Sequence, residues 1–230
     1  DGDDVNEYTL SPGFDVSTAS YVQNFSVAAQ ESGPVSLVFN NDGTKMFVMG
    51  YDGDDINEYA LSTPFDVSTA SFNGDSEKFL VAGQESTPRS LAFNNDGTKM
   101  FVLGISGDDV NEYTLSPGFD ISTAIYAGDS ERFSVTAQET TPNSLAFNND
   151  GTKMFVMGYD GDDVNEYTLS PGFDVSTASY VQNFSVAAQE TSPNSLAFNN
   201  DGTKMFVMGT IGDDVNEYTL SPGFDVSTAS

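Results

Sequence analysis

Short apolar segments separated by polar turns run along the whole chain, and each segment has the length of a β-strand. Residues 195–199 form one such segment, and residues 204–209 form a second that is apolar nearly throughout, which predicts a strand covered on both faces. The Asn-Asp-Gly-Thr stretch between them is a strong hairpin signal. Residues 215–220 and 180–186 supply two further segments with β-branched and aromatic side chains. Since no helical periodicity lasts beyond a turn or so, the pattern predicts an all-β fold.

These segments recur at a fixed period. The heptapeptide Gly-Asp-Asp-Val/Ile-Asn-Glu-Tyr occurs five times, beginning at Gly2, Gly53, Gly107, Gly161 and Gly212. The segment Asn-Asn-Asp-Gly-Thr-Lys-Met-Phe-Val occurs four times, beginning at Asn40, Asn94, Asn148 and Asn199. Four short antiparallel strands in each period of 51 or 54 residues predict the blade of a β-propeller. A β-sandwich does not explain the repeat, and the coils of a β-solenoid are usually much shorter.

The repeats divide the chain into units of one propeller domain, residues 1–230. We expect a partial unit at 1–30, full units at about 34–82, 88–136 and 142–186, and a partial unit at 193–221. Inner strands at 36–40, 90–94, 144–148 and 195–199 predict four blades of four antiparallel strands. Because the chain begins in the middle of a repeat, it is expected to be a processed product or a slice of a longer array.

The strand count does not close evenly. The N-terminal outer strand at 21–27 is expected to complete the last blade, so that the two termini share one blade. The third strand of the repeat unit then occurs once too often. The surplus copy is either residues 1–20 or residues 211–230, and it is expected to be displaced, disordered or paired with another molecule. A ring of five blades is the less favoured alternative, because it would lack two inner or middle strands and one outer strand.

Two long segments of the chain are nearly identical. Residues 1–50 and 160–209 differ only at Ser32/Thr191, Gly33/Ser192, Val35/Asn194 and Val38/Ala197. Near-identical segments can exchange partners between molecules, so the sequence predicts self-association. A unit repeated almost unchanged also offers no obvious place for a single asymmetric catalytic site.

Composition removes several classes of function. The formal charge is −28, from 35 acidic and 7 basic residues, and this field repels nucleic acid and anionic lipid. No Cys and no His are present, which removes thiolate chemistry and the commonest general base. No apolar run approaches the length that spans a membrane, so no membrane insertion is expected. The 18 Phe and 10 Tyr residues are enough for a packed core.

The Gly-Asp-Asp turns are the candidate metal sites, because Ca²⁺ prefers oxygen ligands. Their carboxylates are Asp3, Asp4, Asp54, Asp55, Asp108, Asp109, Asp162, Asp163, Asp213 and Asp214. No copy follows the spacing of a known calcium loop, so the favoured interpretation is a tight turn whose Asp side chains cap backbone N–H groups. We expect no catalytic residue and no cofactor.

Three further repeat positions have two interpretations each. Lys45, Lys99, Lys153 and Lys204 either form an anion-binding ring or, as we favour, pair locally with carboxylates. Phe14, Phe65, Phe119, Phe173 and Phe224 either stack on sugars or, as we favour, fill the gap between blades. Met46, Met100, Met154 and Met205 are expected in the core. The outer strands at 21–27 and 180–186 lack protective charges and are the edges expected to serve assembly.

Residues 193–207, Pro-Asn-Ser-Leu-Ala-Phe-Asn-Asn-Asp-Gly-Thr-Lys-Met-Phe-Val, resemble the first hairpin of NHL-, YVTN- and WD40-like propellers, although the Trp-Asp dipeptide is absent. Residues 164–178 resemble tandem repeats of phage fibre-like and bacterial surface proteins. The resemblance covers the whole chain and implies a propeller. Together with the acidity it implies a location outside the cell, at a cell surface or on a virion.

These observations predict a non-enzymatic structural or adhesive propeller that assembles with itself, as a homo-oligomer or filament, through repeat or strand-exchange contacts. The alternative is a lectin-like propeller that binds a cell-surface glycan through several equivalent weak sites. An enzyme with paired carboxylates ranks third, because that chemistry needs one asymmetric cleft.

Overall fold

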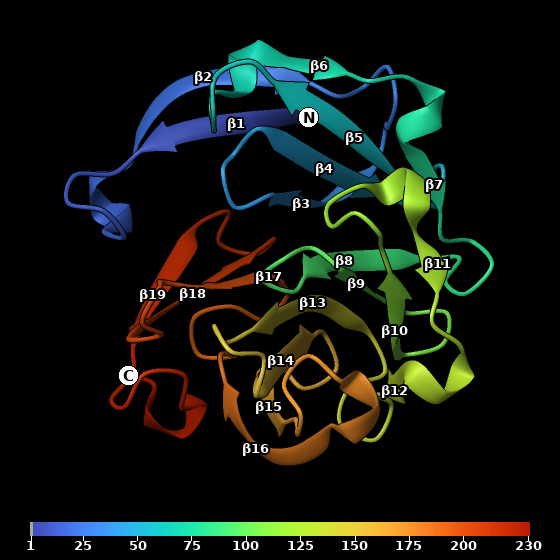
Figure 1. Cartoon of the computed structure of the whole chain (residues 1–230). Helices are drawn as coiled ribbons and strands as arrows, with labels where there is room; N and C mark the ends of the chain where they lie inside the picture. The colour runs from blue at the N-terminus through green and yellow to red at the C-terminus, as the bar shows by residue number, and fades with distance from the viewer. Residues whose placement is uncertain (1) are drawn as a thin grey trace.

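A computed structural model describes residues 2–230 and shows an all-β propeller with four blades (Figure 1). The first blade runs outward through β3 (Pro34–Phe39), β4 (Lys45–Gly50), β5 (Asp55–Leu61), β6 (Ala70–Phe72) and β7 (Lys78–Leu80). The second comprises β8 (Pro88–Phe93), β9 (Lys99–Gly104), β10 (Asp109–Thr114), β11 (Ile125–Tyr126) and β12 (Arg132–Ser134). The third comprises β13 (Pro142–Phe147), β14 (Lys153–Gly158), β15 (Asp163–Thr168) and β16 (Ser179–Ser185).

The fourth blade has three strands, and a two-stranded sheet lies beside the first blade. The fourth blade comprises β17 (Pro193–Phe198), β18 (Lys204–Gly209) and β19 (Val215–Thr219). The separate sheet pairs β1 (Asp4–Thr9) with β2 (Ser20–Ser26). Its register corresponds to that of the third and outer strands β15 and β16.

Short 3-10 turns complete the blades. Those that follow the third strand of each unit are η1 (Val16–Thr18), η2 (Val67–Thr69), η4 (Ile121–Thr123), η6 (Val175–Thr177) and η7 (Val226–Thr228). In the first two blades η3 (Asp75–Glu77) and η5 (Asp129–Glu131) divide the outer strand in two. Among the described residues no helix is long and apolar enough to cross a membrane.

The predicted all-β propeller with four inner strands is confirmed. The inner strands are β3, β8, β13 and β17, and each begins two residues before its predicted start, at a proline. Proline lacks a backbone donor and is tolerated at the first residue of a strand. Each inner hairpin turns at a glycine in the left-handed region, for example Gly97 at φ +70°, which is the conformation that an Asp-Gly turn supplies at least cost.

The closure of the ring differs from the expectation. Strand β2 pairs with β1 and not with β19, so the termini do not share a blade and the fourth blade keeps three strands. Neither copy of the third strand is displaced, because β19 pairs with β18. The physical reason is local: β1 and β2 are joined by a short loop, so their pairing closes a much smaller loop than pairing between the two ends of the chain.

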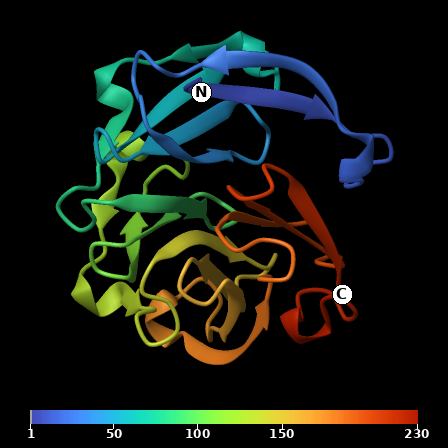
Figure 2. The same ribbon diagram turned by 180° about the vertical axis from the view of Figure 1, so that it is seen from behind.

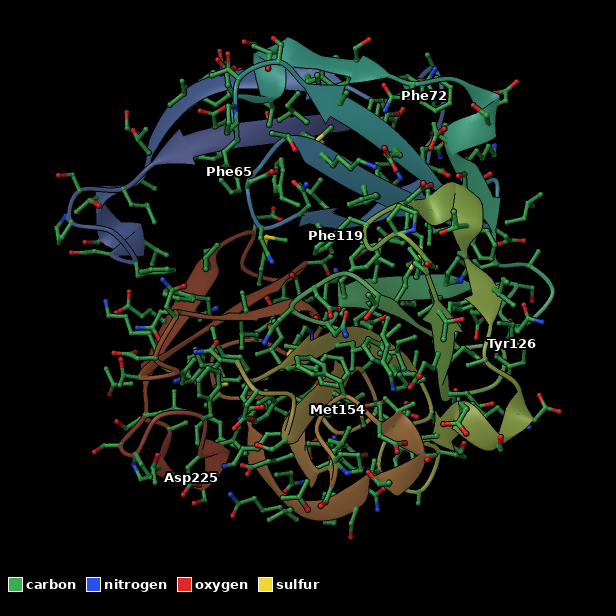
Figure 3. The ribbon with its side chains drawn as sticks, in the orientation of Figure 1. Phe65, Phe72, Phe119, Tyr126, Met154 and Asp225 are labelled. Atoms are coloured by element: carbon green, nitrogen blue, oxygen red, sulfur yellow. The ribbon has the colours of Figure 1, made fainter. Side chains whose placement is uncertain are left out.

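Apolar clusters between neighbouring blades form the core. One cluster joins Phe47 and Met49 of the first blade to Leu91, Met100 and Val102 of the second, all buried. Equivalent clusters join the second blade to the third and the third to the fourth. A smaller cluster packs Val5 and Val27, from the two-stranded sheet, against the first blade. Met154, labelled in Figure 3, is fully buried, and the same holds for the other methionines at this repeat position, as predicted.

The two-stranded sheet occupies its own position in the ring. The Phe119 ring stacks on Phe47 of the preceding blade with centroids 6.4 Å apart, and Phe14 stacks on Phe206 at the same distance. On the other side, Gln23 of β2 donates to Asp66 of the first blade, as Gln182 of the third blade donates to Asp225 of the fourth. The β1–β2 sheet therefore lies between the fourth and the first blade (Figures 1 and 2).

Candidate functional site

A central cavity of about 830 Å³ opens where the four inner strands begin. All four inner strands contribute to its wall, and β1 contributes Asp4, Val5 and Asn6 on the side where the ring has no inner strand. The volume falls within the range of small-molecule sites in proteins. Asp4 is the acidic residue and Arg89 the basic residue among the residues that line it.

The repeats diverge at the mouth of this cavity. The second residue of the inner strand is Asn in two blades, Asn143 and Asn194, but Val35 in the first and Arg89 in the second, and all four line the cavity. The residue after the second strand is Tyr in two blades, Tyr51 and Tyr159, which line the cavity, but Ile105 and Thr210 in the others. The blades are equivalent in their backbones, yet the cavity mouth is chemically asymmetric.

Arg89 differs from the other basic residues of the chain. Six of the seven Lys and Arg side chains form ion pairs with carboxylates. Within residues 2–230, Arg89 forms none, and its buried Nε atom has no hydrogen-bond partner. The guanidinium lies over the ring of Tyr51, 5.5 Å from the centroid. A planar cation held on an aromatic face, with its donors free, is suited to bidentate binding of a carboxylate or phosphate.

Polar groups on the opposite side of the mouth are linked across blades. The Tyr159 hydroxyl donates to Asn194 Oδ1 in the next blade. Asn143 Nδ2 donates to the carbonyl oxygen of Pro193 at 3.3 Å. Phenol and amide groups can both donate to and accept from hydroxyl groups of a ligand. The mouth therefore combines one cation, two tyrosines and two amides.

Buried glutamates fix the loops that lead into the inner strands. Glu85 Oε1 accepts from the backbone N–H groups of Thr87 and Ser106, at 2.7 and 3.0 Å. Glu139 makes the equivalent bonds in the next blade, and its burial raises the pKa of its carboxyl group. These carboxylates have the rigid, desolvated surroundings of positioning groups, and neither lines the cavity.

The Gly-Asp-Asp carboxylates contact neighbouring side chains, and within residues 2–230 none of them accepts from a backbone N–H group, so the expected capping is not found. The first Asp of four of the five turns, Asp54, Asp108 (φ +51°), Asp162 and Asp213, adopts a left-handed backbone conformation. The second Asp pairs with the outer strand: Asp55 lies 2.5 Å from Lys78 Nζ, and Asp109 lies 3.1 Å from Arg132. No group of three or more acidic residues within residues 2–230 is arranged to hold a metal ion. Calcium binding at these turns remains the less favoured interpretation, which this geometry does not test.

The lysine and phenylalanine positions hold neighbouring blades together. The Lys99 Nζ atom lies 2.8 Å from the buried Glu112 carboxylate, in agreement with the favoured interpretation of local pairing. It also donates at 2.8 Å to the carbonyl oxygen of Phe173, in the loop of the next blade. Phe119, Phe173 and Phe224 each stack on a phenylalanine of the preceding blade and fill the gap between blades as predicted. Phe65 does not: it packs on Phe39 of its own blade and is 52% exposed (Phe65 and Phe119 are labelled in Figure 3).

The sequence did contain a signal for the cavity mouth. Of the four positions that distinguish residues 1–50 from 160–209, Val35 and Asn194 line the cavity, as does Val38. Gly33 adjoins the ring of Tyr51, so that a Cβ atom there would lie 3.0 Å from it. Arg89 was missed because repeat analysis looks for what the units share, whereas the site is formed by what they do not share.

Comparison with known proteins identifies the fold. No protein-family model matches the chain, and no curated protein does either. Similar solved structures include a protein from Bacteroides uniformis with the provisional name 6-phosphogluconolactonase, at TM-score 0.59 and 13% identity, covering 100% of this chain and 64% of that one. A protein of the same provisional name from Bacteroides fragilis has TM-score 0.59 and 15% identity, covering 99% and 62%. A nidogen/laminin complex has TM-score 0.59 and 11% identity, covering 96% and 72%.

These similarities show the propeller fold, and this chain spans less than two thirds of the length of the two Bacteroides proteins. They contradict the prediction of a non-enzymatic structural or adhesive module and its lectin-like alternative, because two of these neighbours carry the names of enzymes. The argument behind that prediction also fails on the geometry, since equivalent repeats here surround an asymmetric cavity. The expected location outside the cell and the expected self-association stay predictions.

Proposed function

We propose that the central cavity binds a small anionic sugar derivative and that the chain hydrolyses its lactone form. The observation that carries this proposal is the Arg89 guanidinium, which forms no ion pair with a carboxylate within residues 2–230, although the chain has a net charge of −28. A cation without an ion pair among the described carboxylates of so acidic a chain is best explained by an anionic ligand.

Each part of such a ligand has a matching group at the cavity mouth. Arg89 takes a phosphate or carboxylate, and Tyr51 holds the guanidinium plane in place. Asn143, Asn194 and Tyr159 supply hydrogen bonds for hydroxyl groups. The provisional names of the two Bacteroides proteins specify a phosphorylated sugar lactone, which has an anionic group, hydroxyl groups and a hydrolysable ester.

Hydrolysis of a lactone needs a group that accepts a proton from water. Water attacks the carbonyl carbon, the bond from that carbon to the ring oxygen breaks, and the ring oxygen takes up a proton to give the open sugar acid. Asp4 is the carboxylate in the cavity wall and is proposed to take the proton of the attacking water. Its Oδ2 atom is oriented by Asn24 Nδ2 at 3.1 Å.

Calorimetric titration with 6-phosphogluconate, with gluconate and glucose for comparison, tests the binding. Replacing Arg89 by alanine removes a charge-assisted contact of about 1.5–3 kcal/mol, so the dissociation constant for 6-phosphogluconate should rise about 10–100-fold. Arg132→Ala is the matched control, because it removes the same side chain from an outer strand, where it pairs with Asp109. Equal affinity of the wild type and Arg89→Ala would contradict the proposed site.

The reaction is tested separately, by following acid release from 6-phosphogluconolactone above its spontaneous rate. Asp4→Asn should lower the catalysed rate and leave the affinity for 6-phosphogluconate within about threefold, because the amide keeps the shape and removes the base. Binding without any catalysed hydrolysis by the wild type would refute the enzymatic part of the proposal and leave the binding part standing.

A further inference from the structure

Two interfaces in the ring are held by the amide group of a glutamine. Between the third and fourth blades, the Gln182 Nε2 atom donates to Glu166 Oε2 and to Asp225 Oδ1, each at 2.9 Å. Asp225, labelled in Figure 3, lies at the N-cap of η7 in the fourth blade. Gln23 makes the equivalent two bonds between the two-stranded sheet and the first blade. At each of these interfaces one amide group therefore joins two carboxylates of neighbouring sheets.

In the second blade a glutamate takes the position of this glutamine. Strands β10 and β12 are paired as far as Asn111 and Arg132, so the next facing residues of the two segments are Glu112 and Glu131. Glu131 belongs to η5, which packs on η6 of the third blade, where Asp174 lies at the N-cap position. Three carboxylates, from Glu112, Glu131 and Asp174, therefore meet where the other interfaces have two carboxylates and an amide.

One oxygen of Glu112 lacks the partners that its counterpart has. Its Oε1 atom pairs with Lys99 Nζ at 2.8 Å, but its Oε2 atom is buried and has no hydrogen-bond partner within residues 2–230. Glu112 as a whole is 2% exposed, so water does not supply the missing contact readily. The equivalent Glu166 Oε2 accepts from Gln182 and from the backbone N–H group of Val226.

The charges at this interface do not balance. Burial raises the pKa of the Glu112 carboxyl group, although Lys99 opposes the shift. The negative charges of Glu131 and Asp174 raise this pKa further, which shows that both lie within electrostatic reach of Glu112. Three carboxylates and one ammonium group carry a net charge of −2 when all four are ionised. A buried carboxylate oxygen beside two further carboxylates is stabilised by a cation.

The first blade repeats this arrangement at its interface with the second. Glu77 takes the glutamine position beside Glu58, and η3 packs on η4, which is capped by Asp120. The Glu58 Oε2 atom is buried and has no hydrogen-bond partner among the described residues. Lys45 Nζ and Asn73 Nδ2 both contact the other oxygen, Oε1. The same difference thus occurs twice, at the two interfaces whose outer strand is interrupted by a Gly-Asp-Ser-Glu turn.

We propose that each of these two interfaces binds one calcium ion in the place that the glutamine amide has elsewhere. The ligands are the three carboxylates at each interface: Glu112, Glu131 and Asp174 at one, and Glu58, Glu77 and Asp120 at the other. Ca²⁺ prefers oxygen ligands and accepts irregular geometry, and water completes its coordination. Its two positive charges neutralise the charge that the lysine leaves. These sites are separate from the central cavity, which none of the six residues lines.

Binding requires a movement of the third carboxylate. Within residues 2–230 no three acidic side chains already have the geometry of a metal site. The Glu131 side chain is partly exposed, and among the described residues its carboxylate accepts one hydrogen bond, from the Ser130 hydroxyl at 3.2 Å. Rotation of this side chain toward Glu112 Oε2 brings both oxygens to a common ion. Because the site is not preformed, we expect a dissociation constant of about 10⁻⁴–10⁻³ M, as in weak calcium modules.

Equilibrium dialysis with CaCl₂ in NaCl at constant ionic strength tests the proposal. The wild type should bind two ions per chain in this concentration range. The double variant Glu77→Gln/Glu131→Gln should bind neither, because it installs the amide found at the other two interfaces. Asp75→Asn/Asp129→Asn is the matched control, because it removes the same charge from the same two turns, and it should still bind two.

The opposite substitution provides a gain of binding that no loss of stability can imitate. Gln182→Glu supplies a third carboxylate between the third and fourth blades, so it should raise the number of bound ions from two to three. Undiminished binding by Glu77→Gln/Glu131→Gln would overturn the proposal, since these carboxylates would not be the ligands. A wild type that binds no calcium beyond the ionic-strength effect, or a Gln182→Glu variant without a third ion, would overturn it equally.

Discussion

One sequence, Val-Asn-Glu-Tyr-Thr, occurs in β1, β10, β15 and β19 with very different surroundings. In β10, residues Val110 to Tyr113 are all buried, because β9 covers one edge and neighbouring blades cover both faces. In β1 only Val5 is buried, and Tyr8 is 55% exposed. In β19 only Tyr218 is buried. Four of the five residues are thus core in a closed blade, whereas one is buried in β1 and one in β19, so neighbouring strands, and not the segment itself, decide what it contributes to stability.

The largest expected effect comes from the tyrosine of this segment. Tyr113→Ala removes a fully buried ring that packs edge-on against Phe79, and should cost about 3–5 kcal/mol of unfolding free energy. Tyr8→Ala removes an exposed ring and should change the unfolding free energy by about 0.5 kcal/mol. Urea denaturation of both variants measures the difference. Equal losses would mean that β1 is as well covered in solution as β10.

The lysine contact between blades should show the next largest difference. Lys99→Met leaves Glu112 buried without its cation, which should lower the unfolding free energy by about 3 kcal/mol. Protonation of Glu112 would recover part of this loss. Lys204→Met should cost about 1 kcal/mol or less, because its partner Glu217 is partly exposed and solvent replaces the lysine. Repeating the denaturation at pH 5 should reduce the difference between the stability losses of Lys99→Met and Lys204→Met, since a protonated Glu112 needs no cation. A gap that does not change with pH would point to packing of the lysine side chain as the cause.

The third and smaller difference is between Gly→Ala substitutions at equivalent positions of two loops, Gly118 and Gly13. Gly118→Ala forces a methyl group toward the Asp96 carbonyl oxygen and should cost about 1–3 kcal/mol. Gly13→Ala should be neutral or stabilise by up to about 1 kcal/mol, because the methyl group meets no atom within 4 Å and the substitution restricts the unfolded chain. Thermal denaturation measures both variants. A destabilised Gly13→Ala variant would show that the space beside Gly13 is filled in solution.

The pH dependence of stability tests the buried carboxylates of the closed blades. Burial raises the pKa of Glu58 and Glu112 above the usual 4.5, although the paired lysines oppose the shift. The folded state therefore disfavours their ionised form, and stability is gained as pH falls from neutrality to about 4.5. Bonds from Thr98 and Thr152 lower the pKa of Asp96 and Asp150 below 3.8, so the stability they supply is lost below that pH.

We expect a melting temperature that rises on acidification and falls again below about pH 3.8. Calorimetric scans at constant ionic strength, which keep the screening of the net charge fixed, measure it. A melting temperature that only declines from pH 7 downward would show that the buried glutamates are stabilised as ions in the closed blades.

The candidate site was predictable only in part. Local pairing of Lys99 and the packing of Phe119 between blades follow from residue type, because a lysine in an acidic chain finds a carboxylate nearby and an apolar ring is most stable when buried. Arg89 and Tyr51 are 38 positions apart in the sequence and meet only because adjacent blades place the start of one inner strand beside the end of a second strand. No periodicity reports that contact, since it forms at positions where the repeats differ.

By itself the sequence determined the strands, the hairpin turns and the number of inner strands, because these depend on local propensity and on a repeat that can be recognised in the amino-acid sequence. It did not determine how the ring closes. Two nearly identical copies of the third strand compete for the same partner strand, and no difference in their sequences favours one copy over the other. The tertiary structure decided, by pairing β2 with its near neighbour β1, and so left β1 to line the side of the cavity that has no inner strand. Loop-closure entropy is the physical reason, since it depends on which segments are joined and not on which residues they contain.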